Sequence, residues 1–317
     1  MSFDLNSFRH RLANQLLLRK RNLPFRSALM LEDAVRLLLV AAVGSLIPFT
    51  ASGQQYPIKL DPQEKAGQSY HLIAWSTEKT TVDVRAVAQV LQQSEDILAA
   101  EISADVTILE ASAGGWATRK RFKVLSSRVT SAGITSPILP NGTQVTASIQ
   151  NGATVYEVDQ KLVDEKTARA LRRLIGLHVV SVANDDIFGT PTPKKIGERW
   201  PAGVDAIKKL LKEIGDQSSN PEITGSSTIE KVENNHIFLR ASVSVRNVLL
   251  PGELTTEAGE LEMELWGRFP IRQSDTTVES NDRIRLTRIA SGINADGKKV
   301  TLQVVYERTS RYETRPV

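Results

Sequence analysis

Apolar and polar residues alternate with a period of two along several long stretches of this chain. Between Ile237 and Val245 every second residue is apolar, and the residues between them are mostly polar. Residues 103–111 and 298–309 show the same alternation. The pattern is typical of antiparallel strands that bury one face and expose the other. The sequence therefore predicts long amphipathic strands.

Short turn sequences separate these alternating stretches. Asn151-Gly152 lies between residues 143–150 and 153–159, and Asn-Gly between two alternating runs is the strongest local signal for a hairpin. Gly114-Gly115, Asn234-Asn235 and residues 294–297 occupy similar positions between other runs. We therefore expect neighbouring strands to be joined by hairpins.

Two stretches in the middle of the chain have helical periodicity instead. Residues 163–180 carry acidic residues early and arginines late, as the helix dipole favours. Residues 201–217 have Pro201 near the start and Gly215 as a stop signal. Between them, residues 185–200 are rich in proline. Pro191 and Pro193 are expected to force an extended path, and Gly197 permits a turn before Trp200.

These patterns predict an α+β protein that is mainly β. The expected architecture is a curved antiparallel sheet or half-barrel of long strands with two central helices. Residues 54–67 are polar and contain prolines, which indicates a tether. Residues 54–317 are expected to form a single β-rich domain, with a possible internal boundary in the loop near 216–226.

An uncharged apolar run of 13 residues extends from Leu37 to Phe49. A membrane-spanning helix needs about 20 apolar residues, whereas a secretory signal needs about 7 to 15. A basic segment precedes the run, and the small residues Ala51-Ser52-Gly53 follow it. We predict that residues 1–53 are a signal peptide cleaved between Gly53 and Gln54. The alternatives are an uncleaved anchor in the inner membrane, formed by residues 37–50, and a buried core helix.

Charge and cysteine content narrow the possible partners. Residues 1–53 contain seven Lys and Arg against three Asp and Glu, so residues 54–317 hold 33 of each charge. This balance argues against nucleic acid and against an anionic membrane surface as partners. The chain has no cysteine, so it has no disulfides, no thiol nucleophile and no cysteine metal ligand. Export would place it in the periplasm or outside the cell.

No motif nominates a cofactor, a metal or a reaction. Residues 292–299 match a phosphate-binding loop in part, but a strand follows where that motif needs a helix. His71, His178 and His236 are isolated and lack the spacing of metal ligands. Glu262 and Glu264 are expected on a solvated strand face. We therefore predict no cofactor, no metal site and no catalytic residue.

The segment from Pro137 to Pro201 carries a family resemblance. A Phe-Gly-x-Pro-x-Pro run and an Ile-Gly-x-x-Trp-Pro run follow the turn sequence of residues 137–147. The segment resembles uncharacterised exported bacterial proteins built from long antiparallel strands, and it departs from them at Glu198, where Asp is usual. The resemblance implies a fold and a location, but no activity. A looser resemblance is to periplasmic lipoprotein carriers, whose half-barrel encloses helices over an apolar cavity.

Trp200 lies at the end of this segment. We expect it to fill an edge of the core, with its indole N–H donating to a backbone carbonyl. It is also the one candidate ligand-binding residue, as an aromatic gate on a cleft.

The leading hypothesis is an exported, non-enzymatic binding or scaffolding protein of the cell envelope. It would hold an apolar ligand or a protein partner against the curved sheet. The alternative is an envelope hydrolase whose site is assembled around one of the three histidines, with a carboxylate and a hydroxyl nearby. Exposed strand edges also leave homo-oligomerisation by sheet addition open.

Overall fold

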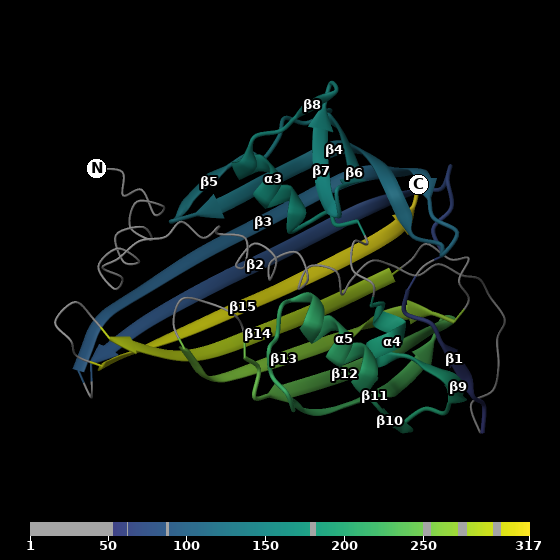
Figure 1. The fold of residues 1–317 in the computed structure, drawn as a ribbon. Coiled ribbons are helices and arrows are strands. Elements are labelled where there is room, and N and C mark those ends of the chain that lie inside the picture. Colours follow the sequence, from purple (N-terminus) through teal and green to yellow (C-terminus); the bar gives the residue numbers. More distant parts are fainter. Residues whose placement is uncertain are drawn as a thin grey trace.

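A computed structural model describes residues 53–61, 63–86, 89–177, 182–249, 255–271, 278–293 and 299–317. Residues 1–52, which hold most of the predicted signal peptide and the alternative anchor 37–50, His178 and the turn sequence 294–297 lie outside the described residues. The dominant element is an open, curved, antiparallel sheet of 13 strands (Figure 1). The prediction of a mainly β protein with a curved antiparallel sheet is therefore confirmed.

The sheet is continuous from its first strand to its last. Its order is β10 (Arg199–Pro201), β11 (Glu222–Glu233), β12 (His236–Arg246), β13 (Thr255–Pro270), β14 (Val278–Ile293), β15 (Lys299–Pro316), β2 (Ser69–Ala86), β3 (Gln89–Ala111), β4 (Ala117–Ser131), β6 (Gln144–Gln150), β7 (Ala153–Val158) and β8 (Lys161–Leu162). β5 (Ile134–Ser136) pairs with β4, while β1 (Tyr56–Ile58) and β9 (Thr190–Lys194) form a separate two-stranded sheet.

Strands from both sides of residues 216–226 belong to the large sheet, in which β15 pairs with β2. The expectation of a single domain from residue 54 onward stays a prediction.

The predicted alternation separates the two faces of the sheet. Ala104, Val106 and Ile108 of β3 are buried on one face, and so are the alternate residues from Ile237 to Val245 of β12. We call this the inner face, because the helices pack against it, and the opposite one the outer face. The contrast is weaker in β15: Val300 is buried, but the residues of both faces from 301 to 307 are only half-buried.

The predicted hairpins form where the turn residues indicated. Asn151 and Gly152 both have positive φ, and Gln150 pairs with Ala153 across the turn between β6 and β7. Asn234 and Asn235 also have positive φ and join β11 to β12. Positive φ at both central residues matches the right-handed twist of the flanking strands.

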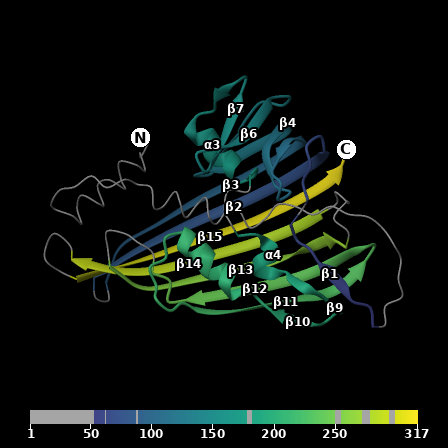
Figure 2. The same ribbon diagram turned by 45° about the vertical axis from the view of Figure 1, so that its right-hand side comes forward.

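Both predicted helices are present, as α3 (Glu165–Arg172) and α5 (Val204–Glu213). A third, short helix, α4 (Asn184–Phe188), which the sequence did not predict, begins the proline-rich stretch. It forms because the prolines start only at Pro191, after Gly189 has ended the helix. Figures 1 and 2 show all three helices on the same side of the sheet. No helix in the described ranges is long and apolar enough to cross a membrane.

The prediction of a tether at residues 54–67 is wrong. Residues 56–61 and 63–68, which we call the strap, are packed against the body of the protein. Tyr56, Ile58 and Leu60 are buried, and β1 pairs with β9. Alternate apolar side chains in a short polar segment were the missed signal, because burying each of them contributes about 1.5–3 kcal/mol.

Two buried ion pairs lie on the inner face near the middle of the sheet. Glu78 of β2 accepts a 2.6 Å hydrogen bond from Nε of Arg173, just after α3. Asp282 of β14 accepts a 2.9 Å bond from Arg308 of β15. All four residues are buried. The first pair fixes the end of α3 on the sheet, because separating it would leave a charge without water.

Charge pairs between neighbouring strands cover much of the outer face. Arg285 lies 3.6 Å from Glu262, and Arg283 lies 3.0 Å from Glu307. Glu262 and Glu264 point outward, as predicted, and alternate with Leu261, Met263 and Leu265, which are buried. Because β14 lies between β13 and β15, its arginines cannot lie at an edge of the sheet. Arg283 and Arg285 instead belong to its solvated face.

One long strand has an open edge. β3 pairs with β2 from Gln89 onward, but its pairing with β4 begins only at Leu98. Residues 89–97 therefore have a described neighbour on one side only, and a register shift against Val84 and Arg85 distorts this edge. Homo-oligomerisation by sheet addition stays a prediction.

Candidate functional site

A shallow groove crosses the outer face where β14, β15 and β2 lie side by side. Its volume is about 510 Å³. Ile73 and Trp75 of β2 contribute apolar surface, and both are exposed to more than a third. The polar lining comes from the two neighbouring strands and includes Asn281, Thr309, Arg311 and Glu313.

Strand register places Trp75, which lines the groove, in one row with Trp266, which lies one strand beyond the groove lining. Trp266 of β13 pairs with Asn281, Asn281 pairs with Arg311, and Arg311 pairs with Trp75. Direct register partners in an antiparallel sheet project from the same face. With strands about 4.8 Å apart, the backbones at Trp266 and Trp75 are about 14 Å apart. The floor of the groove is a rigid ladder, so the row is held in a fixed geometry.

The groove is electrostatically balanced. Arg311 lies 2.9 Å from Glu279 and 3.9 Å from Glu313, and its side chain is about half exposed. Each exposed pair of this kind contributes about 0–1 kcal/mol to stability. The guanidinium and the carboxylates therefore remain available to a partner that offers complementary groups.

At one end of the groove, His71 lies between a hydroxyl and a carboxylate. Its Nε2 is 3.2 Å from Oγ of Ser103, and its Nδ1 is 3.1 Å from Oδ1 of Asp105. His71 and Asp105 are register partners on β2 and β3, and Ser103 pairs with the groove residue Ile73. The three side chains therefore share the outer face.

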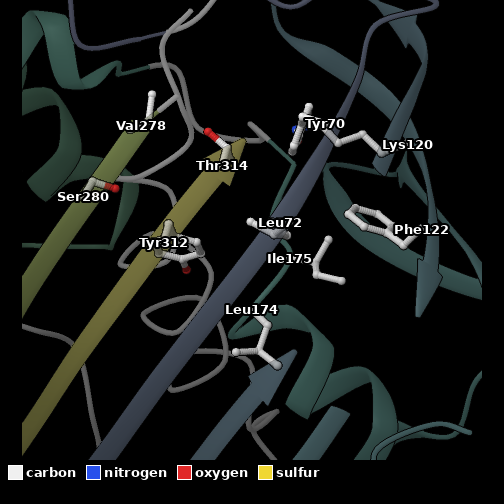
Figure 3. A pocket seen from close by; sticks show the side chains of 11 residues that line it. Tyr70, Leu72, Lys120, Phe122, Leu174, Ile175, Val278, Ser280, Tyr312 and Thr314 are labelled. Carbon is white, nitrogen blue, oxygen red and sulfur yellow. The ribbon is translucent and has the colours of Figure 1, made fainter. Parts of the chain in front are cut away.

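A second, much smaller cavity lies on the inner face (Figure 3). Its lining is mainly apolar and includes Leu72, Phe122, Leu174, Ile175 and Val278. The cavity volume is only about 20 Å³. A water molecule needs about 10–15 Å³ on this measure, so the cavity has room for about one water and not for a lipid chain.

Lys120 and Tyr70 line one end of the inner cavity. Nζ of Lys120 lies 2.5 Å from Oε1 of Glu64 in the strap and donates a 3.3 Å hydrogen bond to Oη of Tyr70. Burial alone would lower the pKa of Lys120, but Glu64 and Tyr70 outweigh it and raise that pKa overall. Burial also raises the pKa of Tyr70. The amine is therefore a cation already matched by an internal carboxylate.

The strap carries a second buried carboxyl group. Oδ2 of Asp61 accepts a 2.5 Å hydrogen bond from the backbone N–H of Asp185, and Oδ1 of Asp185 accepts a 2.7 Å bond from Leu60. Burial, followed by the charge of Asp185, raises the pKa of Asp61 to about 8. Asp185, in the first turn of α4, is therefore part of a packed contact between the strap and this helix.

The structure separates the residues that the sequence singled out. Trp200 is buried, and its Nε1 donates a 2.8 Å hydrogen bond to the carbonyl oxygen of Phe188, as predicted. It lines neither cavity described above. His236 is buried with Nδ1 2.8 Å from the carbonyl oxygen of Asn234. Gly53 and Gln54 begin the described chain, and cleavage between them stays a prediction.

Sequence reasoning named His71 as a candidate but missed its partners Ser103 and Asp105 and the row of Trp75 and Trp266. Ser103 is 32 positions from His71, and Trp75 belongs to a different strand from Trp266. No local spacing signals such neighbours, because strand register creates them. Among the described residues, no three His, Asp or Glu side chains gather closely enough to hold a metal ion.

Comparison with known proteins gives no family. No protein-family model matches the sequence, and no curated protein matches it. A lipovitellin structure aligns with 80% of this chain at a TM-score of 0.25 and 7% identity, and this chain spans only 26% of the lipovitellin chain.

Two bacterial structures align more weakly still. OpdQ of Pseudomonas aeruginosa has a TM-score of 0.18 and 9% identity, with 78% of this chain and 98% of that chain covered. An outer membrane channel of Pseudomonas putida F1 has a TM-score of 0.15 and 9% identity, with 84% and 100% covered. These scores are too low to carry any functional argument, and the exported family suggested by residues 137–201 stays a prediction.

Proposed function

We propose that this protein is an exported binding or scaffolding protein of the cell envelope that engages a protein partner through the groove on its outer face. The observation that carries the proposal is the row formed by Trp266, Asn281, Arg311 and Trp75. Tryptophan and arginine are the residue types most enriched among those that dominate binding energy at protein interfaces.

The volumes of the outer groove and the inner cavity favour binding of a partner at the outer face over binding of a ligand inside the protein. The inner cavity of about 20 Å³ is far smaller than the 300 to 1,000 Å³ or so of small-molecule sites. The outer groove of about 510 Å³ lies within that range, but it is open along one side of a sheet. An open groove on a rigid sheet suits another protein's surface better than a lipid, which needs enclosure.

The charges of the outer face favour a protein over other macromolecules. Cations and carboxylates alternate across the strands, as in the pairs Arg128–Glu101, Lys79–Glu95 and Arg283–Glu307. A nucleic acid or an anionic membrane needs an unpaired basic stripe. A protein partner can present the mixed charges that this face would complement.

In-cell photocrosslinking tests the proposal. A benzoylphenylalanine at position 309 places the reactive group in the groove. We expect one crosslinked product of defined mass, reduced at least fivefold by Trp75→Ala. Leu125→Ala is the matched control, because Leu125 and Trp75 are each 38% exposed.

A crosslink that survives both Trp75→Ala and Trp266→Ala would place the partner elsewhere. A hydrophobic dye that binds the purified protein in a displaceable, one-to-one manner would instead favour an apolar ligand on the inner face. The predicted export is tested separately by mass spectrometry of the N-terminus from native cells. That N-terminus is Gln54 if residues 1–53 are removed, and a longer chain if residues 37–50 remain as an anchor.

A further inference from the structure

The hydroxyl, the imidazole and the carboxylate on the outer face are joined in the order that nucleophilic catalysis uses. Oγ of Ser103 lies 3.2 Å from Nε2 of His71, and Nδ1 lies 3.1 Å from Oδ1 of Asp105. Each ring nitrogen therefore has one partner, the hydroxyl on one side and the carboxylate on the other. In sites of nucleophilic catalysis, a carboxylate orients the base and the base is hydrogen-bonded to the nucleophilic hydroxyl. This arrangement identifies catalytic triads on unrelated folds.

The sheet holds the three groups in place. His71 and Asp105 are direct register partners, and Ser103 lies two positions before Asp105 on the same face of β3. β3 is paired on both sides here, with Ile73 of β2 and Ser126 of β4 opposite Ser103. Sites built on strands are positioned more accurately than sites built on loops.

The constellation is open to solvent and continuous with the groove. The side chain of His71 is 25% exposed and that of Asp105 is 41% exposed. Ile73, the register partner of Ser103, lines the groove. A molecule seated on Ile73 and Trp75 can therefore place a reactive carbon next to Oγ of Ser103.

We propose that Ser103, His71 and Asp105 hydrolyse carboxylic esters presented at the groove. Oγ of Ser103 forms a bond to the acyl carbon, and its proton passes to Nε2 of His71. His71 then gives that proton to the leaving alkoxide, which departs as an alcohol. Water attacks the acyl-serine, His71 accepts a proton from the water, and the carboxylic acid leaves as Oγ regains its proton. Asp105 holds Nδ1–H and stabilises the imidazolium formed in each half-reaction.

The surroundings of Ser103 limit the substrate to reactive esters. Ser103 lies within a sheet, paired with Ile73 of β2 and Ser126 of β4, with a register shift against β4 directly after it, and not at the loop or helix N-terminus that commonly supplies an oxyanion hole. Loss of a single oxyanion donor costs other hydrolases about 10²–10³ in kcat. Activated esters, whose leaving groups need little assistance, are therefore cleaved, and amides are not.

A fluorophosphonate probe applied to the full-length protein tests the assignment. The probe modifies activated serines, and mass spectrometry of the digested protein locates the modified residue. We expect Ser103 to be labelled. Ser103→Ala abolishes labelling, and His71→Gln and Asp105→Asn slow it at least tenfold. Hydrolysis of p-nitrophenyl acetate falls in parallel.

Ser126→Ala is the matched control, because Ser126 is the register partner of Ser103 and is exposed on the same sheet. This variant keeps the labelling rate of the natural protein. Circular dichroism of every variant verifies that the sheet is intact. Labelling at another residue, absence of labelling, or a rate at Ser103 unchanged by His71→Gln would overturn the proposal.

The activity goes beyond the proposed binding function, and the two can fail separately. Trp266→Ala, at the far end of the row and three strands from Trp75, weakens partner crosslinking but leaves the labelling of Ser103 by a small probe intact. His71→Gln has the opposite pattern. A protein that crosslinks a partner but shows no labelling is a binding protein alone.

Discussion

Replacing Lys120 with methionine tests whether the buried ion pair fixes the strap to the sheet. Nζ of Lys120 lies 2.5 Å from Oε1 of Glu64, and the two side chains are only 3% and 7% exposed. Glu64 also accepts a 2.8 Å hydrogen bond from the backbone N–H of Ala117. Methionine keeps most of the volume of the lysine stem and removes the charge. Glu64 is then a buried carboxylate without a cation.

The expected loss is about 3–5 kcal/mol of unfolding free energy, the cost of breaking a buried pair by removing one partner. Most of that loss is the desolvation of the remaining charge, not the value of the pair. The double variant Lys120→Met with Glu64→Gln should therefore be more stable than Lys120→Met alone. Together with the single variant Glu64→Gln and the natural protein, these two variants complete a double-mutant cycle that gives the coupling energy.

Urea denaturation followed by tryptophan fluorescence gives these free energies by linear extrapolation. Lys79→Met is the matched control, because Lys79 lies 2.6 Å from Glu95 in a pair whose side chains are 45% and 46% exposed. An exposed pair contributes no more than about 1 kcal/mol. Equal losses of about 1 kcal/mol or less for Lys120→Met and Lys79→Met would refute the reasoning. The strap would then be held by its apolar residues and its hydrogen bonds, without a measurable contribution from this ion pair.

Three further changes test other contacts. Because the pKa of Asp61 is about 8 in the folded state and 3.8 in a free carboxyl group, the folded protein binds an extra proton between these values. Its stability should fall as pH rises from 4 to 8 and level off above, and Asp61→Asn should flatten this slope in urea midpoints at pH 5, 7 and 9. Trp200→Phe removes the 2.8 Å hydrogen bond from Nε1 to the carbonyl oxygen of Phe188 in α4. We expect a loss of about 1–3 kcal/mol of unfolding free energy, measured by thermal melting. An unchanged melting temperature would show that the protein does not depend on this bond. Gly203→Ala would place a methyl carbon 1.9 Å from the carbonyl oxygen of Asp186. A loss of about 3 kcal/mol of unfolding free energy is therefore expected in the same assay. A variant as stable as the natural protein would contradict this close packing.

Local pattern was sufficient to place the strands, the turns and the two longer helices. The alternation from Ile237 to Val245 determined which side chains of β12 are buried. Asn151-Gly152 determined a hairpin, because these residues tolerate the positive φ that the turn requires. Gly215 marked the end of α5 to within two residues. The same reasoning failed for the strap and for α4, where the local signal was short and polar.

The sequence by itself determined a mainly β protein with one wet and one buried sheet face, because a period of two is a property of each strand alone. Only the tertiary structure decided what those faces bring together. His71 meets Ser103 and Asp105, and Lys120 meets Glu64, because strand register and chain path join residues far apart in the sequence. The tertiary structure also decided that the inner face is filled by helices and apolar side chains, so that the open groove lies on the outer face. Alternation encodes which way a side chain points, but not which strand lies beside it or how much space remains once the layers have packed.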